Sequence, residues 1–182
     1  MFRAAGLTQW RDRRVVMKVK RMAELALLTA LALIIFVVEL QIPSLTPIPG
    51  IKLGLANVIT VFAVYRYRAG EAALVLLARI ILGSLFSGNM TAIMYSLAGG
   101  ALCLVGMLLL KRAIPEKHMW LCSVFGAVLH NIGQVAVACA VTGTLWIVWY
   151  LPVLVLSGCA AGAFTGLCAQ LFISRLYKGN EK

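Results

Sequence analysis

The feature that most constrains this chain is a series of apolar segments, each long enough to enter or cross a lipid bilayer. The first runs from about Met22 to Ile42, and its only charged residues are Glu24 and Glu39. The hydrocarbon core of a bilayer is about 30 Å thick, and a helix of about 20 residues crosses it. Hydrophobic residues make up 62% of the 182-residue chain and charged residues only 13%, which is typical of integral membrane proteins.

Six such segments can be placed along the chain, which predicts an all-α integral membrane bundle of about six transmembrane helices. The second segment is short, and we expect it to begin inside the preceding loop; Pro152 starts or kinks the sixth. One domain at residues 21–177 would follow a basic arm at residues 1–20 and precede a tail at residues 178–182. The predicted spans are Met22–Ile42, Leu55–Tyr65, Glu71–Phe86, Thr91–Leu110, Trp120–Val141 and Val148–Phe172.

Positive charges predict which end of the bundle faces the cytoplasm. The chain carries 17 Lys and Arg against 6 Asp and Glu, a formal net charge of +11. With six spans, the basic residues of the arm, of the second and fourth connections and of the tail all fall on one side, and Lys52 alone lies on the other. Since Lys and Arg concentrate in cytoplasmic loops, we expect a multi-pass protein of the bacterial inner membrane, the cell membrane, with both termini in the cytoplasm.

The same placement argues against nucleic acid as a partner, because the basic residues flank apolar segments. The arm could contact anionic membrane lipid, or it could act as a topology signal alone. The five cysteines lie in apolar segments without a CxxC spacing, so we interpret them as small buried hydrophobic residues. No metal site, cofactor or disulfide framework is predicted.

Polar residues persist inside several apolar segments, in stretches such as GAVLHNIGQ and RIILGSLFSG. A rise of 1.5 Å per residue places one subset of them near the membrane midplane and the rest nearer the outer end. Such residues are costly in hydrocarbon and usually mark a substrate or ion path. They predict a pocket open to the outside, and pairing with one another as interhelical contacts is the alternative. The set is Arg79, His130, Asn131 and Gln134 at depth, with Glu39, Lys52 and Asn57 near the mouth.

The balance of charge in this set favours an anionic ligand. Arg79, Lys52 and a protonated His130 would outweigh Glu39. Guanidinium groups bind carboxylate and phosphate through two hydrogen bonds. We therefore predict a small-molecule substrate that carries one of these groups.

Five stretches, PGIKLGLAN, RIILGSLFSG, SLAGG, GAVLHNIGQ and YLPVLVLSG, resemble a bacterial membrane family. It is known both as heptaprenyl diphosphate synthase component I and as the Gx transporter family, and the resemblance runs from about Lys20 to Tyr177. This family is similar in turn to the S-components of energy-coupling factor (ECF) transporters. Those are six-helix substrate-binding proteins with cytoplasmic termini and an outward-facing pocket.

The resemblance implies how such a protein works. In S-components the first loop is mobile, and small residues on the first helix dock a shared transmembrane protein that two ATPases drive. By this likeness Ala26 and Ala30 would form the docking patch, and the loop of residues 43–53 would act as a lid. The family shows no strict ligand motif, so the substrate does not follow from the resemblance.

The synthase name suggests catalysis that the residues do not support. Prenyl synthases hold magnesium and diphosphate with aspartate-rich motifs, because hard cations need clustered carboxylates. This chain has one aspartate, Asp12, and no P-loop. We therefore predict no catalytic residues.

The predicted function is that of the substrate-binding membrane component of an uptake transporter. Its solute would be an anionic or phosphate-bearing vitamin, flavin, or prenyl or quinone precursor. One alternative is a non-catalytic membrane subunit that works with a prenyl synthase catalytic subunit. A structural membrane adaptor is another.

Overall fold

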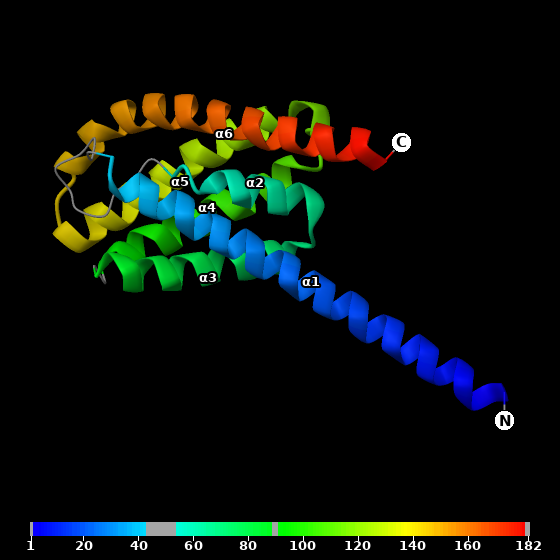
Figure 1. Cartoon of the computed structure of the whole chain (residues 1–182). Helices are drawn as coiled ribbons and strands as arrows, with labels where there is room; N and C mark the ends of the chain where they lie inside the picture. Colours follow the sequence, from blue (N-terminus) through cyan, green and yellow to red (C-terminus); the bar gives the residue numbers. More distant parts are fainter. Residues whose placement is uncertain (1, 43–53, 89–90, 181–182) are drawn as a thin grey trace.

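Every regular element in the described part of the chain is a helix (Figure 1). The computed structural model describes the backbone of residues 2–42, 54–88 and 91–180. This architecture confirms the predicted all-α membrane bundle. The elements are α1 (Phe2–Leu40), α2 (Asn57–Arg66), α3 (Ala69–Ser87), α4 (Thr91–Leu110), α5 (Met119–Thr142) and α6 (Leu151–Asn180), with short 3₁₀ helices η1 (Glu116–His118) and η2 (Trp146–Tyr150).

Five helical segments in the described residues are long and apolar enough to cross a membrane, and α2 is the exception. Its 10 residues rise about 15 Å, half the thickness of the hydrocarbon core. Helix α2 is thus the short second segment that the sequence predicted. The multi-pass character of the protein is confirmed.

Helix α1 begins well before the predicted first span. It runs from Phe2 to Leu40, so the backbone of the basic arm continues the membrane helix, and Figure 1 shows it extending away from the bundle. Inside the bundle, a stripe of α1 residues with i, i+3 and i+4 spacing packs against α2 and α3. This stripe is Leu25, Leu28, Ala32 and Phe36, all buried.

Glycines let α5 approach both of its main neighbours closely. A Cβ atom added at Gly133 would lie 2.8 Å from the carbonyl oxygen of Ala98 on α4. A Cβ atom at Gly166 on α6 would lie 2.5 Å from the Cα atom of Trp120 on α5. Backbones this close exclude larger residues, so the small-residue spacing of α6 serves packing inside the bundle.

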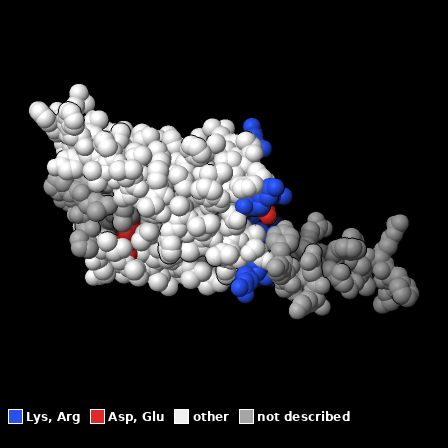
Figure 2. All heavy atoms as spheres, turned by 90° about the horizontal axis from the view of Figure 1, so that it is seen from above, with Lys and Arg blue, Asp and Glu red and all other residues white. Residues whose placement is uncertain are grey.

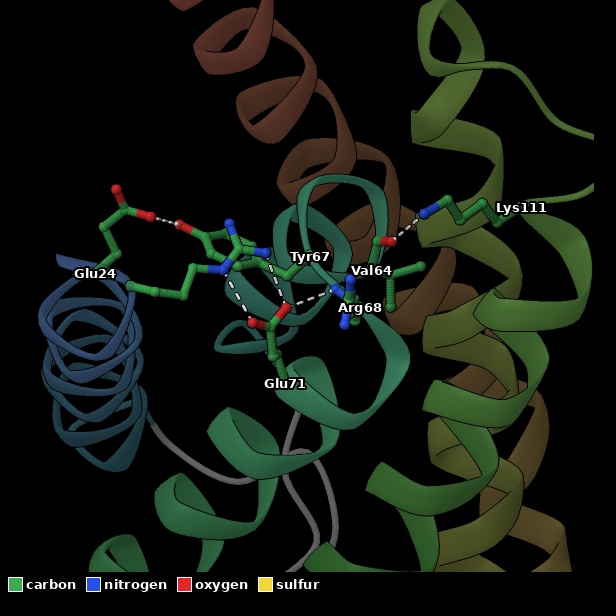
Figure 3. Close-up of polar contacts among 7 residues, drawn as sticks. Glu24, Val64, Tyr67, Arg68, Glu71 and Lys111 are labelled. Atoms are coloured by element: carbon green, nitrogen blue, oxygen red, sulfur yellow. Dashed lines mark hydrogen bonds and ion pairs between the residues drawn. The ribbon is translucent and has the colours of Figure 1, made fainter. Parts of the chain in front are cut away.

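Hydrogen bonds and an ion pair connect α1 to the connection between α2 and α3 (Figure 3). Arg21 donates two hydrogen bonds of 2.9 Å to the carboxylate of Glu71, and its guanidinium lies 4.2 Å from the ring centroid of Tyr67. The Tyr67 hydroxyl donates to Glu24 at 3.1 Å. Burial raises the pKa of Tyr67, and the hydrogen bond to Glu24 raises it further, so this hydroxyl stays protonated.

Basic side chains gather at this same end of the molecule. Lys111, on the turn after α4, donates to the carbonyl oxygen of Val64 in the last turn of α2 at 2.6 Å. Figure 2 shows Lys and Arg at one end of the face in view and none over the rest of its described surface. The predicted segregation of positive charge is therefore present in the described bundle. Its exposed members are Lys18, Lys20, Arg66, Arg68, Arg112, Lys117 and Arg175.

Candidate functional site

Six of the seven predicted ligand-binding residues lie in the described part of the chain, and all six are buried. Each is at most 5% exposed, so none of the six faces the lipid. The six are Glu39, Asn57, Arg79, His130, Asn131 and Gln134. Lys52 and the loop predicted to act as a lid lie outside the described residues.

Gly54 is the point where three of these residues meet. Its N–H donates to the carboxylate of Glu39 at the end of α1. Its φ of +79° is the left-handed region that favours glycine. A Cβ atom there would also lie 2.8 Å from Nδ2 of Asn57 and 3.2 Å from the ring of His130. The turn before α2 thus joins α1, α2 and α5, and both its conformation and its packing require glycine.

Arg79 enters the same region from the middle of α3. Its guanidinium lies close enough to the Glu39 carboxylate for the opposite charges to attract, and it also lies near His130. One turn further along α3, Gly83 makes room for the ring of Phe36, because a Cβ atom there would lie 2.9 Å from that ring. The contact between α1 and α3 therefore brings Glu39 and Arg79 into the same region.

His130 and Gln134 share one face of α5, as their i, i+4 spacing predicts, and this face meets α4 at Gly99. A Cβ atom at Gly99 would lie 2.9 Å from Nδ1 of His130 and 3.0 Å from Cγ of Gln134. Gly99, the first glycine of SLAGG, thus leaves the space that these two polar side chains fill. We call Glu39, Asn57, Arg79, His130 and Gln134 the buried polar cluster.

Asn131 lies apart from this cluster, although it follows His130 directly in the sequence. Its side-chain Nδ2 donates to the carbonyl oxygen of Leu154 on α6, and Gly158 leaves room for it there. Successive residues point about 100° apart around a helix, since 3.6 residues make one turn. Asn131 therefore joins α5 to α6, while His130 faces α4 and the cluster.

The buried polar cluster keeps hydrogen-bonding groups that no described residue satisfies. These are both amide atoms of Asn57, Nε of Arg79, Nδ1 of His130 and Oε1 of Gln134. A buried polar group without a partner costs about 1–3 kcal/mol. Such groups are rare in native interiors, and each calls for an explanation. A ligand that both donates and accepts hydrogen bonds would supply one.

Ala26 and Ala30 lie on the exposed side of α1. Large apolar residues surround them on this side, including Met22, Leu27 and Ile34, which are each at least 60% exposed. The α1 stripe packed on α2 and α3 lies on the other side of the helix. The two alanines are therefore accessible from the membrane.

The described residues contain no group of three or more His, Cys, Asp or Glu that could hold a metal ion. The five cysteines are free, and Cys103 and Cys122 are buried in the hydrophobic core.

Searches of curated proteins and of solved structures returned no match. The family model described as heptaprenyl diphosphate synthase component I matches residues 28–172. That range holds 145 of the 182 residues and includes every member of the buried polar cluster. The chain belongs to the heptaprenyl diphosphate synthase component I family.

Proposed function

We propose that this protein is the substrate-binding membrane component of an uptake system for a small solute that carries an anionic group. The observation that carries the proposal is the buried polar cluster, in which Nε of Arg79 and amide atoms of Asn57 and Gln134 lie without hydrogen-bond partners inside an apolar bundle. Ionisable residues at this depth are costly, and they usually serve a substrate or ion path.

The chemistry of the cluster favours a particular kind of solute. Arg79 offers a guanidinium, which binds carboxylate or phosphate with charge-assisted hydrogen bonds. Asn57 and Gln134 offer amide groups for polar atoms elsewhere on the same molecule. A vitamin, a flavin or a quinone precursor with an acidic group has this combination, and a phosphate-bearing prenyl precursor offers the anionic group alone.

The proposed working cycle uses both ends of the bundle. The basic end lies in the cytoplasm, by the tendency of Lys and Arg to remain there, and the solute enters from the other end of the cell membrane. The exposed Ala26 and Ala30 on α1 dock a transmembrane partner of the energy-coupling factor type, which two ATPases drive. Small residues suit this role, since they let two helices approach closely in lipid.

A second candidate function follows from the family name. In that role the chain is a non-catalytic membrane subunit beside a prenyl synthase catalytic subunit, and the cluster receives the anionic head of a prenyl compound. A catalytic role for this chain is disfavoured, because its single aspartate, Asp12, cannot form the clustered carboxylates that magnesium and diphosphate need.

Affinity purification of the tagged chain from gently solubilised membranes, with mass spectrometry of the co-purifying proteins, tests these functions against each other. The leading proposal expects a transmembrane protein together with ATPases. A soluble protein with aspartate-rich motifs, and no ATPase, would reject transport in favour of the synthase subunit. An untagged membrane preparation is the control for non-specific capture.

A further inference from the structure

Asn57 is a buried amide whose hydrogen-bonding groups are all unused by the described residues. It is 2% exposed, and neither its Oδ1 nor its Nδ2 has a hydrogen-bond partner, so the side chain lacks partners in either orientation of its amide. An asparagine close to the start of a helix usually bonds to backbone N–H groups. Asn57 is the first residue of α2, yet it makes no such bond, and helix capping does not account for it.

Unpaired groups from α2 and α5 lie side by side around the ring of His130. A Cβ atom at Gly54 would lie 2.8 Å from Nδ2 of Asn57 and 3.2 Å from this ring. On the other side of the ring, both Nδ1 of His130 and Cγ of Gln134 lie against Gly99. One molecule bound beside His130 can therefore meet the amides of both helices.

The unpaired atoms of the cluster include donors and acceptors of hydrogen bonds. Nε of Arg79 and Nδ2 of Asn57 donate, and Oδ1 of Asn57 and Oε1 of Gln134 accept. Nδ1 of His130 is also unpaired and serves as either, according to its tautomer. The two amide oxygens therefore need two hydrogen atoms from a bound molecule.

This requirement separates the functional groups that a solute can carry. An ionised carboxylate or phosphate only accepts hydrogen bonds, so it satisfies Arg79 and leaves both amide oxygens unpaired. A hydroxyl group has a single hydrogen and satisfies one of them. A primary amide has two N–H groups and a carbonyl oxygen, which match both oxygens and the Asn57 donor.

We infer, on the basis of the proposed function, that the solute carries an amide group in addition to its anionic group, with the amide bound by Asn57 and Gln134 and the anion by Arg79. The side chain of an asparagine pairs in two directions with a neighbouring donor and acceptor, as it does with the edge of adenine. A prenyl diphosphate has no N–H group. The inference therefore favours amide-bearing solutes over prenyl precursors.

The test compares succinamate and its next two homologues with levulinate and its next two homologues. Each keto acid has a methyl group in place of the NH₂ of the matching amide, and the same carbon chain, carbonyl oxygen and carboxylate. Binding to the purified full chain is measured by calorimetry in detergent. At one or more lengths, the amide should bind the wild-type chain at least about tenfold more tightly than its keto acid, because the keto acid leaves buried acceptors without a partner.

Leucine variants attribute this preference to the two amides of the cluster. Asn57→Leu and Gln134→Leu should each reduce it, because each removes an acceptor for one N–H of the probe. Gln170→Leu is the matched control: it also removes a buried amide oxygen without a partner, but it lies on α6 outside the cluster and should keep the preference. Arg79→Gln should weaken binding of both series.

The possible results separate the inference from the proposed function. Keto acids that bind as tightly as amides at every length, with Arg79-dependent affinity, would overturn the amide inference alone, and bound water would then be the partner of the amide oxygens. A preference that persists in both Asn57→Leu and Gln134→Leu would also overturn it. Absence of Arg79-dependent binding in both series would contradict the proposed binding function itself, and the inference with it.

Discussion

His130 and Asn131 are adjacent in the sequence, yet they serve different contacts. His130 lies against Gly99 and Gly54 in the buried polar cluster, and Asn131 donates to Leu154 on α6. One residue thus faces the candidate ligand site, and the next holds two helices together. Gln134 lies on the same face of α5 as His130. Substitutions of Asn131 and of Gln134, one turn apart on α5, should therefore have different effects.

Replacing Asn131 by Leu should lower the stability of the bundle. The variant loses the hydrogen bond to Leu154, and its branched side chain must fit beside Gly158. Interhelical hydrogen bonds in membranes contribute about 0.6 to 2 kcal/mol, so we expect a loss in the free energy of unfolding of about that size. Unfolding in mixed micelles, followed by circular dichroism, measures it.

Gln134→Leu is the matched comparison for Asn131→Leu. Its Oε1 has no partner among the described residues, so the free energy of unfolding should stay level or rise. The amount of any small molecule that co-purifies with the chain, measured by mass spectrometry, should fall. A stable Asn131→Leu protein beside an unstable Gln134→Leu protein would reverse these assignments.

At the scale of elements, close glycine contacts decide how α4, α5 and α6 pack. Gly166→Ala should lower the free energy of unfolding by about 1–3 kcal/mol, as overpacking does, because its Cβ atom would meet the backbone of Trp120. Gly70→Ala in α3 is the control, since nothing lies within 4 Å of the Cβ atom there. Alanine favours helix, so that variant should be neutral or slightly stabilised. Equal stabilities of the two variants would argue against tight α5–α6 packing.

The exposed side of α1 carries the prediction about partner docking. Ala26→Trp or Ala30→Trp should abolish solute uptake while leaving solute binding intact, because both residues point away from the α2–α3 interface. Uptake by cells and binding to the purified variant are measured in parallel. Val38→Trp, also on an exposed position of α1, tests whether any bulky change on this helix has the same effect. Loss of binding in the alanine variants would reject the docking role.

Helix positions were largely predictable from the sequence, and helix contacts were not. The apolar segment at Thr91–Leu110 matches α4 residue for residue, because its length and its flanking loops leave few alternatives. The start of α1 at Phe2 was missed, since hydropathy detects the membrane and not the continuation of a helix into water. The depth of Arg79 could be counted along one helix, but the attraction between Arg79 and Glu39 depends on how α1 and α3 pack.

At the scale of the whole molecule, charge segregation predicts orientation. Leu145 lies on the connection before α6, at the end opposite the basic residues, and Lys117 lies at the basic end; both are exposed. In intact cells, Leu145→Cys should react with a membrane-impermeant maleimide, and Lys117→Cys should react only after permeabilisation. The wild-type chain controls for labelling of native cysteines. The opposite pattern would place the basic end outside the cell.

The central claim is that the buried polar cluster binds a solute, and one measurement tests it most directly. The wild-type chain and Arg79→Gln are purified in parallel from the same cells, and the small molecules released from each are compared by mass spectrometry. The claim predicts a compound in about stoichiometric amount with the wild-type chain and strongly depleted from the variant, with both proteins equally folded by circular dichroism. The same compounds in equal amount from both proteins, or none from either, would contradict it.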